Sequence, residues 1–149
     1  MITIVICVLI GVNTALQSSH VSQEDICREL NTRNTTSGPP ELSKAISFAK
    51  TLFCNEFEAE NFNTYLVCSK EKTSSINAHC KTEAALSSTD CPRKAEAMDC
   101  TLKQSIEVCQ AGQNELIKMA LLGEIGILIG PGKCKKELIE AMRKLQKKL

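Results

Sequence analysis

The sequence predicts an all-α fold: a single disulfide-stabilised bundle of five to seven short helices. Three observations lead to this fold class. Apolar residues repeat at helical spacing, eight cysteines are scattered singly after an apolar leader, and aromatic residues are scarce. With no Trp, one Tyr and four Phe, the core must be built from Leu, Ile, Ala, Met and cystine, which favours helices over a β-sandwich.

Residues 1–19 are expected to be a signal peptide, cleaved between residues 14 and 19. The stretch from Ile2 to Ile10 has the length of a signal-peptide apolar core and is too short to cross a bilayer. Cleavage removes Cys7 and leaves residues 20–149 as one cysteine-rich domain with an even number of cysteines, which suits disulfides in an oxidising compartment. We therefore expect a secreted, extracellular protein. The cysteines expected in disulfides are Cys27, Cys54, Cys68, Cys80, Cys91, Cys100, Cys109 and Cys134.

The mature chain is expected to open with a short helix that runs through Leu30. Ser22 can cap this helix, with Asp25 at the capping-box position. Residues 31–40 have the composition of a loop, and the sequon that begins at Asn34 lies in it. Glycosylation of Asn34 is therefore expected.

A long helix is expected from Pro40, because proline suits the first helical turn. Its apolar stripe is Leu42, Ile46, Ala49 and Phe53. Two further elements are expected, one starting at Asn61 or Asn63 and one over residues 74–86.

The sharpest helical pattern covers residues 91–111. Pro92 suits its first turn, Asp90 or Cys91 its cap and Gly112 its stop. The apolar stripe of this segment is Cys91, Ala95, Met98, Leu102, Ile106 and Cys109. We expect this segment to be the central spine of the bundle, with other helices on both sides.

Helix geometry restricts the disulfides of this segment. Cys100 lies nine residues from both Cys91 and Cys109, which corresponds to a rise of about 13.5 Å. Bonded cysteines have Cα atoms about 4.4–6.8 Å apart, so no two of these three can pair in an intact helix. Each is therefore expected to bond outward, to one of the other five cysteines.

Residues 116–130 are the most apolar stretch of the mature chain. With only fifteen residues, and with Lys118 and Glu124 among them, they fall short of the about 20 that a membrane span needs. Two interpretations stay open. The segment is the buried helix of a bundle, or its glycines at 123, 126 and 130 leave gaps that form a cavity for an apolar ligand. The candidate cavity residues are Met98, Leu102, Ile106, Leu116, Met119, Leu122 and Ile125.

The last helix, over residues 134–149, is strongly basic. Residues 133–149 hold seven basic side chains against two glutamates. They form either an ordinary bundle helix whose basic end suits its dipole, or a cationic face that docks on an anionic membrane or glycan surface. The candidate contacts with such a surface are Lys133, Lys135, Lys136, Arg143, Lys144, Lys147 and Lys148.

The sequence lacks the residues that metal binding, hydrolytic catalysis and nucleic-acid binding require. No close cysteine pair exists for a metal, and His79 beside Cys80 is the only candidate ligand pair. His79 is also the only well-placed imidazole, and no Gly-x-Ser-x-Gly elbow accompanies it. The formal net charge of +1 argues against a nucleic-acid binder. We therefore expect no enzyme, no metal and no cofactor.

The order Cys27-x26-Cys54 followed by Cys91-x8-Cys100-x8-Cys109 resembles part of the cysteine spacing of insect odorant-binding proteins. The Cys-x3-Cys pair of that family is absent, because thirteen residues separate Cys54 from Cys68. The resemblance covers spacing only and implies a secreted helical carrier of small apolar molecules, without assigning any binding residue.

The sequence thus predicts a secreted, non-catalytic binding protein. Its partner would be a small apolar ligand, as for a carrier, or an extracellular protein, as for an interaction module. The alternative is a membrane-active toxin or host-defence protein, acting through the apolar residues 116–130 and the cationic helix over 133–149.

Overall fold

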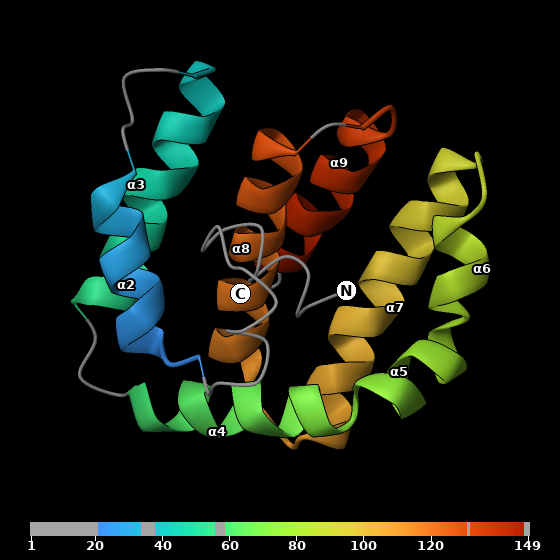
Figure 1. Cartoon of the computed structure of the whole chain (residues 1–149), viewed down its shortest axis with the longest axis horizontal. Helices are drawn as coiled ribbons and strands as arrows, with labels where there is room; N and C mark the ends of the chain where they lie inside the picture. The colour runs from blue at the N-terminus through green and yellow to red at the C-terminus, as the bar shows by residue number, and fades with distance from the viewer. Residues whose placement is uncertain (1–20, 34–37, 56–58, 131, 148–149) are drawn as a thin grey trace.

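A computed structural model describes residues 21–33, 38–55, 59–130 and 132–147, which form helices with no strand among them (Figure 1). The prediction of an all-α fold is confirmed. The helices in chain order are α2 (Gln23–Thr32), α3 (Pro40–Cys54), α4 (Ala59–Glu71), α5 (Thr73–Cys80), α6 (Thr82–Leu86), α7 (Cys91–Val108), α8 (Gln113–Ile129) and α9 (Lys135–Gln146).

The described residues hold eight helices, so the expected number of five to seven is wrong. Residues 74–86, expected as one element, are divided between α5 and α6 at Lys81. Lys81 has a φ of 53°, in the left-handed region, and its N–H donates to the Ala78 carbonyl at 3.4 Å. A left-handed residue cannot continue a right-handed helix, which explains the break.

Helix α8 runs through the middle of the molecule (Figure 1). Helices α2 and α3 lie on one side of it, α7 lies on the other side with α5 and α6, and α4 crosses one end. Helix α9 packs on both α8 and α7. The expectation for residues 91–111 holds in part. Helices α5 and α6 lie on one side of α7 and helices α8 and α9 on the other, as expected. The helix at the centre of the bundle is nevertheless α8, because its residues 116–125 are buried without interruption and only one side of α7 is buried.

The core contains polar groups as well as apolar ones. Lys118 of α8 is buried, donates to Gln23 Oε1 at 3.0 Å and lies 5.2 Å from the ring centroid of Phe62. Gln23 in turn donates through Nε2 to the Phe53 carbonyl at 3.2 Å. Buried polar groups need partners, and here the partners connect α8 to α2 and α3.

Local sequence signals set the starts of the helices. The capping box predicted at Ser22 is present: Asp25 N donates to Ser22 Oγ at 3.3 Å and Ser22 N donates to Asp25 Oδ2 at 2.9 Å. The hydrogen bond from the Ser22 backbone lowers the pKa of Asp25. Asp90, one of the two caps that the sequence offered, caps α7 by accepting from Arg93 N at 3.2 Å, and Cys91 is the first residue of the helix.

The turn between α7 and α8 differs from the prediction. Gln110, with a φ of 53°, ends α7, and its N–H donates to the Glu107 carbonyl at 3.2 Å. Ala111 N donates to the Ile106 carbonyl at 2.9 Å, which completes a Schellman motif. Gly112, predicted as the stop of α7, instead has extended backbone and occupies the N-cap position of α8.

Four disulfides link the helices. They are Cys27–Cys54, Cys68–Cys109, Cys80–Cys100 and Cys91–Cys134, with Cα–Cα distances of 5.2, 5.8, 5.7 and 5.3 Å. The prediction that the three cysteines over residues 91–109 bond outward is confirmed. Helix α7 is thereby joined to α4, to α5 and to the residue that precedes α9.

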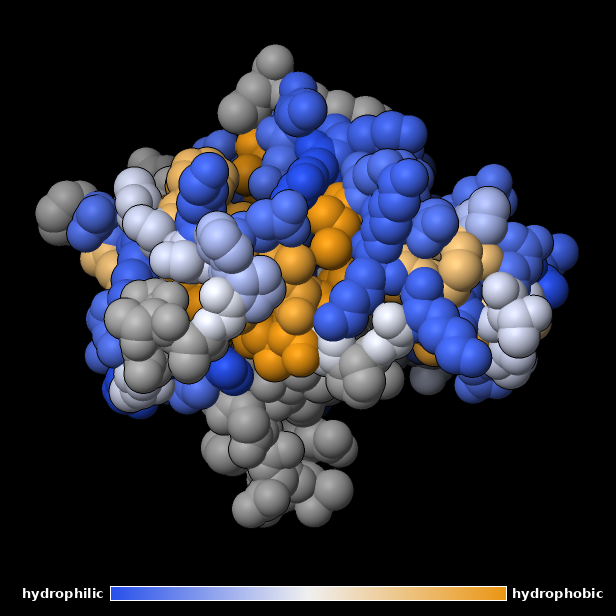
Figure 2. Space-filling view, turned by 90° about the horizontal axis from the view of Figure 1, so that it is seen from above, coloured by the Kyte–Doolittle hydropathy of each residue, from blue (hydrophilic) through white to orange (hydrophobic). Residues whose placement is uncertain are grey.

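The surface shows few large apolar side chains. Seen from above, apolar residues gather near the middle of the molecule, where Figure 1 places the C-terminal end of α8 (Figure 2). Ile127, Leu128 and Ile129 at this end are half-buried against the core. Among the described residues, the exposed large apolar side chains are Phe48, Leu86 and Val108, and Phe48 is the most exposed at 48%.

Candidate functional site

The residues predicted to line an apolar cavity lie in the core. Six of the seven are buried and Ile106 is half-buried against them. At Gly123 the expectation of an open gap is wrong. A Cβ added there would lie 2.8 Å from Met142 Sδ and 3.8 Å from Met98 Cε, so these two side chains fill the space beside the glycine.

The basic residues of α9 and its approach lie on the surface, while the apolar face of this helix does not. Lys133, Lys136, Arg143, Lys144 and Lys147 are exposed, Lys135 is half-buried, and Lys148 lies outside the described residues. Ile139, Met142 and Leu145 are buried. A membrane-active hairpin of α8 and α9 would have to pull these apolar side chains out of the core.

A groove of about 460 Å³ brings two of these basic residues together with residues of α3 and α8. We call it the α3–α9 groove, and its lining is Glu41, Lys44, Ala45, Phe48, Leu121, Glu124, Arg143, Gln146 and Lys147. Ala45 and Leu121 are buried and form an apolar floor, and Phe48 stands half-exposed beside them. The volume falls in the range of small-molecule sites, but the groove is largely open to solvent and would cover only one side of a ligand.

One end of the α3–α9 groove holds a polar network. Glu124 is nearly buried, and its Oε1 accepts from Arg143 Nε at 3.0 Å and from Gln146 Nε2 at 3.4 Å. Arg143 Nη2 also lies 3.8 Å from Glu41 Oε2. Arg143 is therefore engaged with glutamates, whereas Lys44 and Lys147 have no ion-pair partner among the residues that the structure describes.

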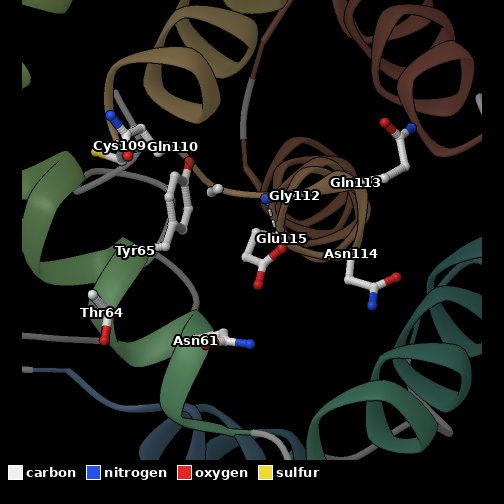
Figure 3. Close-up of a pocket in the computed structure, with 10 residues that line it drawn as sticks. Asn61, Thr64, Tyr65, Cys109, Gln110, Gly112, Gln113, Asn114 and Glu115 are labelled. Atoms are coloured by element: carbon white, nitrogen blue, oxygen red, sulfur yellow. Dashed lines mark hydrogen bonds between the residues drawn. The ribbon is translucent and has the colours of Figure 1, made fainter.

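A second depression, of about 480 Å³, lies where the turn between α7 and α8 faces α4 (Figure 3). We call it the turn pocket. Its lining is Asn61, Thr64, Tyr65, Cys109, Gln110, Ala111, Gly112, Gln113, Asn114 and Glu115. Glu115 is the only charged residue in this set. The other lining residues are uncharged, and most of them are polar.

Tyr65 forms the inner wall of the turn pocket. Its ring is almost fully buried, and its hydroxyl lies 2.6 Å from Ser105 Oγ. Ser105 already donates its own proton to the Leu102 carbonyl at 2.8 Å, so Tyr65 is the donor between the two hydroxyls. Burial raises the pKa of Tyr65 to about 12, and the Glu115 carboxylate adds to the rise.

Glu115 lies in the first turn of α8, at the capping-box position. Its Oε2 accepts from Gly112 N at 3.1 Å, the interaction drawn as a dashed line in Figure 3. Asn61 of α4 extends toward the same space as the Glu115 carboxylate, while Gln113 and Asn114 point away from it. The carboxylate of Glu115 and the amide of Asn61 therefore face the interior of the turn pocket from two helices.

Sequence reasoning missed most residues of both depressions. As candidate contacts it named only Arg143 and Lys147 of the α3–α9 groove, and of the turn pocket it named Cys109 as a disulfide cysteine. Glu124, Asn61 and Gly112 were noted only as a charge in the apolar run and as helix boundaries. Phe48 offered one signal, because an aromatic residue two positions from Ile46 lies off the apolar stripe of its helix. The amides near Gln110 carry no periodic signal.

Other expectations have different outcomes. The expected signal peptide, residues 1–19, and the expected glycosylation site, Asn34, lie outside the described residues. His79 is exposed, and within the described ranges no group of three or more possible ligands gathers for a metal ion. None of the described helices has the length and apolarity that a bilayer crossing requires.

No family model, no curated protein and no solved structure matches this chain.

Proposed function

We propose that the chain is an extracellular, non-catalytic binding protein that holds a small amphipathic anion in the α3–α9 groove. The anion has a free carboxylate on an apolar body. One observation carries the proposal: Phe48 and an apolar floor lie beside Lys44 and Lys147, two exposed cations without ion-pair partners in the described structure. Four disulfides support an extracellular location, because disulfides persist mainly in oxidising compartments.

The apolar body would lie on Ala45 and Leu121 and against the ring of Phe48. A ligand that buries about 200 Å² of apolar surface gains about 5 kcal/mol. Lost freedom on association offsets part of this gain, so we expect a dissociation constant on the order of 1 mM for a short-chain ligand. The packed core leads us to place this ligand at the surface rather than among Met98, Leu102 and Met119.

The preference for an anion follows from which charged groups of the groove already have an ion-pair partner. The Arg143 guanidinium neutralises Glu124, and its 3.8 Å contact with Glu41 is looser. Lys44 and Lys147 remain to meet a ligand charge. A carboxylate near these ammonium groups is favoured over a neutral or cationic head group of the same size.

Calorimetric titration at pH 7 tests the proposal, with octanoate, 1-octanol and octyltrimethylammonium as probes. We expect one octanoate per chain, with 1-octanol at least tenfold weaker and the cation without measurable binding. Equal affinity for octanoate and 1-octanol would contradict the anion site. Leakage of anionic vesicles without octanoate binding would favour the membrane-active alternative instead.

Variants locate the site. Lys44→Gln/Lys147→Gln should weaken octanoate binding at least tenfold, and Phe48→Ser should weaken it by a similar factor. Lys50→Gln/Lys72→Gln is the matched control, because it removes the same charge outside the groove lining. If both double variants weaken binding equally, the effect comes from net charge and the groove is not the site.

A further inference from the structure

We infer that the turn pocket is a second binding site, for a small primary ammonium ion carried on an apolar body. This site shares no lining residue with the α3–α9 groove, so the inference does not rest on the proposed function. It starts from the chemistry of the lining, in which one carboxylate stands among uncharged hydrogen-bonding groups.

The charge of the turn pocket selects a cation. Glu115 is its only charged lining residue, and within the described structure this carboxylate has no ion pair. Its Oε2 is occupied by Gly112 N at 3.1 Å, which leaves Oε1 to accept from a ligand. An anion attracted by the N-terminal end of α8 would meet the Glu115 carboxylate in the first turn of that helix.

The hydrogen-bonding groups suit an ammonium in particular. A primary ammonium has three N–H donors, and the turn pocket offers acceptors from two sides. Glu115 supplies Oε1 from α8, and the Asn61 amide, which extends toward the same space from α4, can turn its Oδ1 to the ligand (Figure 3). Gln110 also lines the pocket, but its side chain lies beside Cys109, on the other side of the Tyr65 ring from these two groups (Figure 3). A quaternary ammonium has no N–H donor and would lose these hydrogen bonds.

The apolar body has its own contacts. Cys109, bonded to Cys68, and Ala111 line the pocket next to the ring of Tyr65. Tyr65 is almost fully buried and its hydroxyl is directed to Ser105, so it leaves the ligand no hydrogen bond and almost no ring surface. The apolar contact therefore comes mainly from the disulfide of Cys109 and from Ala111. A short alkyl or aryl chain fits this wall, with its ammonium at Glu115.

Titration with phenethylammonium at pH 7, followed by calorimetry and by NMR shifts of the turn residues, tests the inference. We expect one site, with shifts at Asn61 and Glu115. 2-Phenylethanol, which has the same ring and chain without the charge, should bind at least tenfold more weakly, and phenylacetate should not bind. Equal binding of phenethylammonium and 2-phenylethanol would overturn the assignment.

Glu115→Gln is the decisive variant. A glutamine at this capping-box position can still accept from Gly112 N, so the start of α8 is kept while the charge is removed. Binding of phenethylammonium should fall at least tenfold. Glu107→Gln, an exposed change in the last turn of α7 outside the pocket lining, should leave it unchanged. A Glu115→Gln protein that binds like the original chain would overturn the inference.

Titration of each variant with both ligands distinguishes a failure of this inference from a failure of the proposed function. Glu115→Gln should not alter octanoate binding, and Lys44→Gln/Lys147→Gln should not alter phenethylammonium binding. Loss of both ligands in either variant would mean that the variant has unfolded, which the far-UV circular dichroism of the same sample reports. In that case Asn61→Leu, which removes the facing amide from an exposed position of α4, replaces Glu115→Gln and should weaken phenethylammonium binding alone.

Discussion

Arg143 Nε lies 3.0 Å from the carboxylate of Glu124, an ion pair that joins α9 to α8 at one end of the α3–α9 groove. The side chain of Glu124 is only 7% exposed, whereas that of Arg143 is 44% exposed. Removing the charge of Arg143 leaves the buried carboxylate of Glu124 uncompensated. This costs more than removing the charge of Glu124, which leaves the more exposed Arg143 without its partner.

Arg143→Met should therefore destabilise the fold. It keeps an unbranched apolar side chain but removes the guanidinium and leaves the Glu124 carboxylate with Gln146 alone, and we expect a loss of about 2 kcal/mol in the free energy of unfolding. Urea unfolding followed by circular dichroism measures it. Arg93→Met, an exposed change on α7, is the control and should cost under about 0.5 kcal/mol.

A double variant checks the cause. Arg143→Met/Glu124→Gln should be more stable than Arg143→Met, because a neutral amide needs no counter-ion. If the losses of the two single variants simply add, the pair is not coupled and this account of α8–α9 packing is wrong.

Tyr65 supplies a prediction on pH, because it is the only tyrosine of the chain and no tryptophan overlaps its spectrum. Burial raises its pKa to about 12 in the folded protein, against about 10 in an unfolded chain. Absorbance of the tyrosinate at 295 nm should therefore titrate about two pH units higher in buffer than in concentrated urea. A native midpoint near 10 would show that the hydroxyl is not buried.

The same two pKa values predict how the stability of the fold changes with pH. The folded pKa is raised above the unfolded one, so this contribution to stability is complete below about pH 10 and is lost as the pH rises toward 12. The slope for one proton is about 1.4 kcal/mol per pH unit. Tyr65→Phe should remove this part of the alkaline loss, and Glu115→Gln should lower the native midpoint, because that carboxylate raises the pKa.

Features that depend on a few neighbouring residues could be predicted from the sequence. The caps at Ser22 and Asp90 each bond to a residue three positions away, so their signals are local. The outward bonding of Cys91, Cys100 and Cys109 also followed from one element, since it requires only that a helix is rigid.

Features that depend on tertiary packing could not be predicted. Lys118 and Glu124 interrupt an apolar run, and nothing near them in the sequence shows that Gln23 and Arg143 meet them. The choice of α8 over α7 as the central helix depends on the same long-range contacts. Both depressions combine buried and exposed residues from separate helices, and no periodic pattern of the sequence brings these residues together.

At Gln110 we expect one substitution to raise the stability of the fold and to weaken ligand binding. It adopts a φ of 53°, where glycine has no steric penalty, so Gln110→Gly should raise the free energy of unfolding by about 0.5–1 kcal/mol. The same change removes an amide from the turn pocket and should weaken phenethylammonium binding. Lys81→Gly relieves the same φ outside both depressions, so it should be stabilising with both ligands bound as before.

Gly123 decides between a packed and an open core beside α8. An alanine in the interior of a helix is about 1 kcal/mol more favourable than a glycine, so Gly123→Ala would be stabilising if a gap lay beside it. In the structure its Cβ would meet Met142 Sδ at 2.8 Å, and Met142 is fully buried and cannot swing into solvent.

We therefore expect Gly123→Ala to be destabilising by about 1 kcal/mol in urea unfolding, because the displaced thioether costs more than the helix gains. Gly132→Ala is the control: no atom lies within 4 Å of its added Cβ, and its effect should stay within about 0.5 kcal/mol. A stabilised Gly123→Ala protein would contradict this packing and would support the other interpretation, an apolar cavity beside α8 in a carrier that holds its ligand inside the bundle.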